Sequence, residues 1–326
     1  MDKKKKLGII IGLGIIIIAG LFIMGRLFFS APQSQKEEIV FIVNRNQTET
    51  QTLDKLKTQG LIKNKTVFRI VLFFKHKQIA SGGYNVSKNM SAWQIANKLT
   101  SAPDMKWVVI PEGLRKEQIG EKLAETFSWS DEELDKWNTE YTKMRIDYIE
   151  GTYFPDTYLI PVDEGGFKIA KRMTRHFDEQ FTPYITQFAE QNIKWTTGLK
   201  LASIIQREAG GKDDMPLIAG ILWNRLNQDM NLEVDATVQY ARGKAEAGWW
   251  APVTSEDIQN IDSPYNTYKY KGLPPFPISN PGLDAIEAVL HPAETDCLYY
   301  LHDSNRQIHC AKTFEEHKAN VEQYLR

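Results

Sequence analysis

An apolar run near the N-terminus constrains where this chain can fold more than any other feature. The sequence MDKKKK precedes 19 positions, Leu7 to Gly25, that are all apolar or glycine, and Leu27 to Phe29 continue the run after Arg26. About 20 apolar residues span the hydrocarbon core of a bilayer, and lysine clusters stay on its cytoplasmic side. We therefore predict a cytoplasmic tail at residues 1–6 and a transmembrane helix at residues 7–29.

A cleavable signal peptide is the alternative interpretation of the same run. The apolar region of a signal peptide usually covers about 7–15 residues, whereas this run is longer and is followed by no clean small-x-small cleavage site. An uncleaved anchor is therefore favoured, with residues 30–38 (SAPQSQKEE) as a polar tether. We expect a single-pass protein of the inner (cytoplasmic) membrane, with the N-terminus in the cytoplasm and the rest of the chain periplasmic or otherwise extracytoplasmic.

The remaining charge argues against nucleic acid as a partner. Five of the 40 Lys and Arg residues lie in the first 26 positions beside a single acid, which leaves 35 basic and 40 acidic residues in the exported part. No basic stripe remains to neutralise phosphates. The histidines lack the paired spacing of a zinc site. We expect no metal and no cofactor.

The two cysteines of the chain flank a predicted β-hairpin. Between Cys297 and Cys310 lies LYYLHDSNRQIH, whose alternation predicts a strand, a turn at Asp303-Ser304-Asn305 and a return strand. An oxidising compartment would favour a cross-strand disulfide, and two buried free thiols are the alternative. The sequence does not decide between them.

The first part of the exported chain carries a weak internal repeat. Three segments align without gaps, and each passes from a short β-like run into an apolar helix: Val43–Leu56, Val86–Leu99 and Ile110–Leu123. The fourth position of each repeat is Asn46, Asn89 or Gly113, residue types that tolerate a left-handed turn conformation. We predict a strand–turn–helix unit that is used three times. The alternative is that the three segments match by coincidence, because such sequence patterns are common in α/β proteins.

Beyond Trp129 the sequence becomes helical. Ser130 opens a helix in the manner of a capping box, and Phe167–Phe188 and Thr197–Ala209 continue the helical period. Residues 251–292 hold seven of the 14 prolines, a composition typical of the rigid walls of a binding groove. The aromatic residues nearby suit the faces of sugars, or pack beneath long loops. The predicted fold class is α+β.

The stretch LKLASIIQREAGG (residues 199–211) places a carboxylate on an apolar helix face. Leu201, Ile204, Ile205 and Glu208 follow the spacing i, i+3, i+4, i+7 and therefore share one side, whereas Arg207 lies on the other. An apolar setting disfavours the charged carboxylate and raises its pKa, as a general acid requires. The alternative is a glutamate whose stem packs on the apolar surface while its head reaches water.

Several motifs resemble those of the endolytic murein transglycosylases (MltG/YceG-like), membrane-anchored enzymes that cut peptidoglycan glycan strands. The resemblance implies a LysM-like strand–turn–helix region at residues 39–128, followed by a mostly helical catalytic domain at residues 129–326 with a C-terminal β-hairpin. The motifs occur in family order over nearly the whole exported chain: VVIPEG (108–113), EGTYFPDTY (150–158), LASIIQRE (201–208), VDATVQY (234–240), SPYNTY (263–268), GLPPFPISNPG (272–282) and HPAETDCLYYL (291–301), with later His and Phe positions to His317.

The resemblance assigns the catalytic role to Glu208. In the family this helix commonly ends in E-[KR]-E-[ST], and the second Glu is catalytic. In this sequence Gln206 stands at the position of the first Glu, and Ala209 stands at the position of the hydroxyl residue. Any hydrogen bond that the hydroxyl would give must therefore come from another group. We predict that seven residues bind substrate: Tyr265, Asn266, Thr267, Tyr268, Asp235, Thr237 and Tyr240. Among them, Asp235 and Thr237 are expected to shape the groove.

The family chemistry needs one carboxylate. Glu208 would protonate the glycosidic oxygen and then deprotonate the C6 hydroxyl of N-acetylmuramic acid (MurNAc), which leaves a 1,6-anhydro end and consumes no water. A lysozyme-type muramidase with Asp235 as second carboxylate is the enzymatic alternative, and a non-catalytic glycan-binding scaffold of wall synthesis is the other. The expected partners are peptidoglycan strands, the membrane and, from the family, peptidoglycan synthases.

The anchor makes a prediction about topology. A reporter fused after Gln35 should be active only on the exported side, because the lysine cluster holds the N-terminus in the cytoplasm. N-terminal sequencing of the mature protein should recover MDKKKK. Recovery of a chain that begins near Ala31 would instead establish a cleaved signal peptide.

Overall fold

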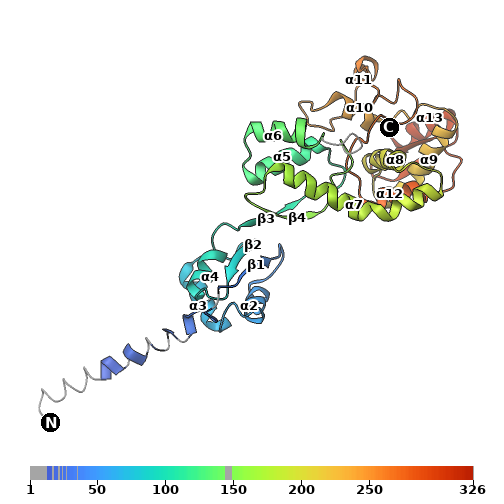
Figure 1. The fold of residues 1–326 in the computed structure, drawn as a ribbon. Helices are drawn as coiled ribbons and strands as arrows, with labels where there is room; N and C mark the ends of the chain where they lie inside the picture. The colour runs from blue at the N-terminus through green and yellow to red at the C-terminus, as the bar shows by residue number, and fades with distance from the viewer. Residues whose placement is uncertain are drawn as a thin grey trace, which may run out of the picture. The chain divides into compact units, whose positions relative to one another are not determined.

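The computed structural model describes residues 13–16, 18–20, 23, 25–26, 28–34, 36–143 and 149–325. It divides into two compact units (Figure 1). The first unit extends to Val108 and includes Tyr158–Asp163, and the second comprises Val109–Thr157 and the chain from Glu164 onward. Much of the predicted transmembrane segment, including residues 7–12, lies outside the described residues. Among the residues that are described, no helix is both long enough and apolar enough to span a bilayer.

A four-stranded sheet organises the first unit. Its order is β1-β2-β3-β4, and β1 and β2 are antiparallel with Glu38 opposite Ser87 and Val43 opposite Gly82. The apolar faces of three helices pack with this sheet around Phe41, Leu53 and Ile95, which have no exposed surface. The elements are β1 (Glu38–Val43), α2 (Glu49–Thr58), α3 (Lys65–Lys75), β2 (Gly82–Ser87), α4 (Ala92–Leu99), β3 (Met105–Val109) and β4 (Thr157–Pro161).

Each of the three repeats forms the predicted strand–turn–helix unit. Helices α2, α4 and α5 (Lys116–Phe127) follow β1, β2 and β3, and α5 belongs to the second unit. Of the three positions whose residue types tolerate a left-handed conformation, Gly113 adopts it, with φ 76°, and Asn46 and Asn89 do not. The first two turns close through hydrogen bonds from the N–H of Gln47 to Asn44 and from that of Met90 to Ser87. Four-residue turns of the common type need no positive φ.

Helix α8 (Trp195–Glu208) lies in the middle of the second unit. It contacts α7, α9, α10 and α12, which surround it in Figure 1. Its side chains Leu201, Ile204 and Ile205 have no exposed surface. The other helical elements are α6 (Asp131–Lys136), a π-helical turn (Trp137–Tyr141), α7 (Gly166–Glu190), a 3-10 turn (Lys212–Asp214), α9 (Met215–Asn227), α10 (Asp235–Arg242), α11 (Ser255–Asn260), α12 (Leu283–Leu290) and α13 (Phe314–Tyr324).

The C-terminal hairpin forms as predicted and carries a disulfide. Strands β5 (Tyr299–His302) and β6 (Ile308–Ala311) are antiparallel, with Tyr300 opposite Cys310. Cys297 and Cys310 are bonded to each other, which decides between the two alternatives for the cysteines. A bridge that closes a loop of this size stabilises a fold by on the order of 3 kcal/mol. It holds β5 in place, and β5 carries a side chain of the site described next.

Candidate active site

Glu208 is the last residue of α8 and continues its buried stripe. Leu201, Ile204 and Ile205 lie in the core, and Glu208 on the same side is half-buried. Ala209 leaves the helix, with φ −68° and ψ 134°. The carboxyl group therefore lies at a helix C-terminus, whose partial negative charge disfavours ionisation. This placement confirms that Glu208 lies on the apolar face, as the helical spacing predicted.

Two hydrogen-bond donors meet the carboxyl group of Glu208. The hydroxyl of Tyr300, on β5, donates to Oε2 at 2.8 Å, and the backbone N–H of Ala236, at the start of α10, donates as well. Burial raises the pKa of Glu208, the Tyr300 hydroxyl lowers it, and the nearby charge of Asp235 raises it again. The balance is a raised pKa. Glu208 therefore keeps its proton at a higher pH than a free glutamate.

The carboxyl group opens into a pocket of about 360 Å³. The lining combines carboxylates with one arginine and several aromatic rings, a composition suited to hydroxyl groups and apolar faces of a sugar. The lining residues are Glu208, Arg225, Leu232, Glu233, Asp235, Tyr268, Tyr299, Tyr300, Phe314 and His317. Of the residues predicted to bind substrate, the structure places Asp235 and Tyr268 in this pocket.

Asp235 and Tyr268 are bonded to each other on the pocket wall. The hydroxyl of Tyr268 donates to Oδ1 of Asp235 at 2.7 Å. Asp235 is exposed and is the first residue of α10, so its carboxylate also lies at a helix N-terminus, which favours negative charge. The two carboxyl groups of the pocket therefore have opposite surroundings. Glu208 is half-buried at a helix C-terminus, and Asp235 is exposed at an N-terminus.

Three other predicted residues lie inside the wall. Asn266, Thr267 and Thr237 are buried. The Nδ2 of Asn266 donates to the carbonyl oxygens of residues 258 and 261, at 3.0 and 2.9 Å. The hydroxyls of Thr267 and Thr237 are 2.9 Å apart, and that of Thr267 accepts from the N–H of Val234 at 3.0 Å. These bonds hold the loop before Tyr268 against the start of α10.

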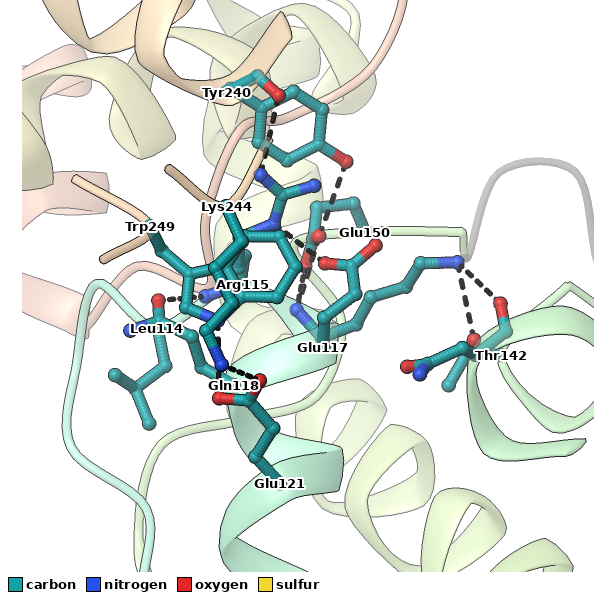
Figure 2. Close-up of polar contacts among 12 residues, drawn as sticks. Leu114, Arg115, Glu117, Gln118, Glu121, Thr142, Glu150, Tyr240, Lys244 and Trp249 are labelled. Carbon is teal, nitrogen blue, oxygen red and sulfur yellow. Dashed lines mark hydrogen bonds and ion pairs between the residues drawn. The ribbon is translucent and has the colours of Figure 1, made fainter. Parts of the chain in front are cut away.

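The last two predicted residues, Tyr240 and Tyr265, belong to a different polar cluster. Their ring centroids are 4.8 Å apart, and the hydroxyl of Tyr240 donates to Oε2 of Glu150 at 3.3 Å (Figure 2). Glu150 has no exposed surface and accepts from the N–H of Lys116 at 3.1 Å and from Nδ2 of Asn280 at 2.8 Å. Burial raises the pKa of Glu150 to about 7. Sequence reasoning did not identify this residue, although its motif, EGTYFPDTY, places a glutamate in an apolar context.

The tryptophans near the proline-rich segment pack on α5 and α8. The guanidinium of Arg115 lies between the rings of Tyr240 and Trp249, 4.2 and 4.4 Å from their centroids (Figure 2). Nε1 of Trp250 donates to Gln118 at 2.7 Å, and the Arg207 guanidinium lies 4.0 Å from the Trp250 centroid. Of the two interpretations of these aromatics, packing beneath a loop describes both tryptophans.

The histidines of the hairpin pair with single carboxylates. His302 Nε2 is 3.1 Å from Asp214, and His309 Nε2 is 3.1 Å from Asp303. Within the part of the chain that the structure describes, no three His, Cys, Asp or Glu side chains gather as metal ligands.

A carboxyl group with a raised pKa, open to a pocket lined by carboxylates and aromatic rings, is the kind of site that acts on glycosidic bonds. The chain belongs to the YceG-like family, which matches residues 41–323, and this confirms the predicted resemblance. A Bacillus subtilis relative named endolytic murein transglycosylase is 31% identical over 293 residues, which cover 83% of this chain and 80% of the relative.

Two further relatives agree with this assignment. An endolytic murein transglycosylase of Streptococcus pneumoniae serotype 2 is 28% identical over 307 residues, which cover 83% of this chain. The chain spans 55% of the length of that relative. A crystal structure of a YceG-like protein from Listeria monocytogenes has a TM-score of 0.60 and 29% identity, and the match covers 87% of this chain and 99% of the Listeria chain.

Glu150 should make stability depend on pH. The pKa of Glu150 in the folded protein is about 7 and lies above the ordinary value of 4.5. The stability that the protonated carboxyl group contributes is therefore complete below about pH 4.5 and is lost as the pH rises through about 7. Between pH 5 and 8 the free energy of unfolding of the wild type should fall relative to Glu150→Gln by about 3 kcal/mol, measured by urea denaturation.

Asp257→Asn provides the control for this measurement. Its side chain is hydrogen-bonded by Thr254 and paired with Arg242, which lower the pKa of Asp257. Because that carboxylate stays charged from pH 5 to 8, the variant and the wild type should keep a constant difference over this range. Parallel pH profiles for the wild type and Glu150→Gln would show that the buried carboxyl group does not titrate as stated.

Proposed function

We propose that this chain is a membrane-anchored lytic transglycosylase. Its substrate is the glycan strand of peptidoglycan, cut at the MurNAc–GlcNAc bond to leave 1,6-anhydro-MurNAc ends. The observation that carries the proposal is the carboxyl group of Glu208, half-buried at the end of α8, with a raised pKa and an open pocket in front of it. Family membership and the names of the relatives support the same activity.

The reaction uses Glu208 twice. The protonated carboxyl group gives its proton to the glycosidic oxygen while the bond from that oxygen to C1 breaks. The resulting carboxylate then takes the proton of the C6 hydroxyl, whose oxygen bonds to C1 and closes the 1,6-anhydro ring. The proton returns to Glu208, and no water is consumed.

Opposing influences on Glu208 suit these two steps. Burial favours the protonated acid that is needed before cleavage, and the donors from Tyr300 and Ala236 stabilise the carboxylate that forms afterwards. Tyr300 thereby supplies a hydroxyl that the family pattern places at the position of Ala209. A group that acts first as an acid and then as a base must be able to exist both as the protonated acid and as the carboxylate.

A hydrolase of the lysozyme kind is the second candidate, because Asp235 lies in the same pocket. In that reaction Asp235 would act as nucleophile or would activate water, and the products would have ordinary reducing ends. The hydroxyl of Tyr268 already bonds Oδ1 of Asp235, which fits a role in shaping the wall better. A non-catalytic scaffold is less favoured, since glycan binding alone does not require an acid on the buried stripe of α8.

The cellular setting completes the proposal. The apolar run Leu7–Phe29 anchors the protein in the inner membrane with residues 1–6 in the cytoplasm, and the first unit contributes the LysM-like strand–turn–helix region. The catalytic second unit then faces the peptidoglycan. Peptidoglycan synthases are the partners that the family suggests.

Glu208→Gln should abolish most activity and leave the fold intact. An amide matches the shape of the protonated acid but supplies no carboxyl proton, so turnover of purified peptidoglycan should fall on the order of 10²–10⁴-fold, with little change in thermal stability. Asp235→Asn is the matched variant in the same pocket and should lose far less. Mass spectrometry of wild-type digests should show anhydro ends.

Each rival predicts a different result in these assays. Reducing ends in the wild-type digest, or equal losses in Glu208→Gln and Asp235→Asn, would establish the two-carboxylate hydrolase. Full activity in Glu208→Gln would remove Glu208 from the chemistry, and the absence of any cleavage by the wild type would favour the scaffold.

Tyr300→Phe should move the pH profile. Without the hydroxyl, the charged form of Glu208 loses a donor and its pKa rises further, so the alkaline limb of kcat should shift to higher pH while the maximal rate falls. Tyr299→Phe, in the same strand and pocket, is the control and should leave the limb in place. A uniform loss in Tyr300→Phe at every pH would assign that hydroxyl a merely structural role.

A further inference from the structure

Helix α3, in the first unit, presents large apolar side chains on both of its sides. Phe68, Val71 and Leu72 are buried against the sheet. On the opposite side Ile70, Phe73 and Phe74 are 44%, 70% and 63% exposed, and the neighbouring Trp93 of α4 is 40% exposed. Several large apolar side chains exposed on neighbouring helices are typical of an interaction site. The ring centroids of Phe73 and Phe74 lie 5.8 Å apart, and Phe74 and Trp93 line the same hollow.

Basic residues surround this apolar surface. Residues 63–77 (KNKTVFRIVLFFKHK) contain five Lys and Arg and no acid. Lys65 and Arg69 pair with Asp54 and Glu49 of α2. The other end of the helix differs, because Lys75 and Lys77 line a shallow hollow of about 460 Å³ together with Phe74 and Trp93. Aromatic and cationic groups therefore point into the same space.

The surface begins where the predicted anchor ends. Phe29 is the last residue of the apolar run, and its ring stacks on Trp93 with 6.4 Å between centroids and 25° between planes. The next residue, Ser30, accepts a hydrogen bond from Nζ of Lys63 at 2.7 Å. Chain continuity thus places Trp93 and the exposed side of α3 at the level where residues 7–29 would leave the bilayer.

We propose that this surface, formed by Ile70, Phe73, Phe74, Trp93, Lys75 and Lys77, docks on the outer leaflet of the membrane that holds the anchor. The aromatic rings enter the boundary between head groups and acyl chains, as interfacial amphipathic helices do. The lysines contact anionic lipid head groups. The proposal rests on the anchor in the proposed function, and it makes the first unit a membrane-bound platform instead of a freely tethered domain.

The test uses the full chain reconstituted in phosphatidylcholine vesicles with or without phosphatidylglycerol. Cys297 and Cys310 are bonded to each other, so a single introduced cysteine can carry an environment-sensitive fluorophore. The label in Phe73→Cys should show blue-shifted emission and lose intensity when the vesicles contain doxyl-labelled lipid. The same label in Val162→Cys, an apolar residue of the first unit that is 46% exposed, should show neither change.

Lys75 and Lys77 should make docking depend on anionic lipid. In vesicles that contain phosphatidylglycerol, Lys75→Gln and Lys77→Gln should each lower the ratio of docked to undocked chains about fivefold. In pure phosphatidylcholine the two substitutions should have little effect, because the surface potential that attracts lysine is absent there. An equal effect in both kinds of vesicle would overturn the assignment of anionic head groups.

A label in Ile16→Cys separates failure of docking from failure of the anchor. If this label is quenched by doxyl lipid while the Phe73 label stays in water in both vesicles, the anchor stands and the docking proposal is overturned. If the Ile16 label is itself in water, the anchor fails and docking fails with it. Energy transfer between Phe73 labels on different chains, without lipid quenching, would assign the surface to a second copy and would also overturn the proposal.

Discussion

The hydrogen bonds to the buried carboxyl group of Glu150 are the interaction on which the second unit depends. They join the N–H of Lys116 at the start of α5 and Nδ2 of Asn280 before α12. The hydroxyl of Tyr240 on α10 donates to the same carboxyl group (Figure 2). Loss of one partner would leave the others buried and unpaired, which costs more than the bond itself contributes. Because the first turn of α10 also gives Glu208 the N–H of Ala236, the cluster supports one wall of the pocket that Glu208 lines.

Two glutamates of the second unit have raised pKa values but differ in their access to solvent. Burial raises the pKa of both Glu150 and Glu208. Glu150 has no exposed surface, and its oxygens face protein donors. Glu208 is half-buried and lines the open pocket. A perturbed pKa identifies a candidate site, and the surroundings of the group decide which kind of site it is.

Local sequence patterns predicted the features that depend on neighbours along the chain. Helical spacing placed Glu208 on the stripe of Leu201, Ile204 and Ile205, and alternation placed the hairpin. Glu150 and Tyr300 escaped prediction because their partners are distant: Asn280 is 130 residues from Glu150, and Tyr300 is 92 residues from Glu208. Sequence periodicity does not predict contacts between residues that are so far apart in the chain. The sequence also did not show that Thr267 and Asn266, which are predicted to bind substrate, have buried side chains.

The replacement of a local hydroxyl by Tyr300 changes what the acid depends on. The motif that the sequence resembles places a hydroxyl residue directly after the glutamate, so that one helix end would supply both groups. Here Ala209 offers none, and the donor comes from β5 of a hairpin that a disulfide closes. The geometry of the acid therefore depends on the integrity of the C-terminal hairpin as well as on α8. The surroundings of the Glu208 carboxyl group are thus set by a strand 92 residues away in the sequence as well as by the helix that carries it.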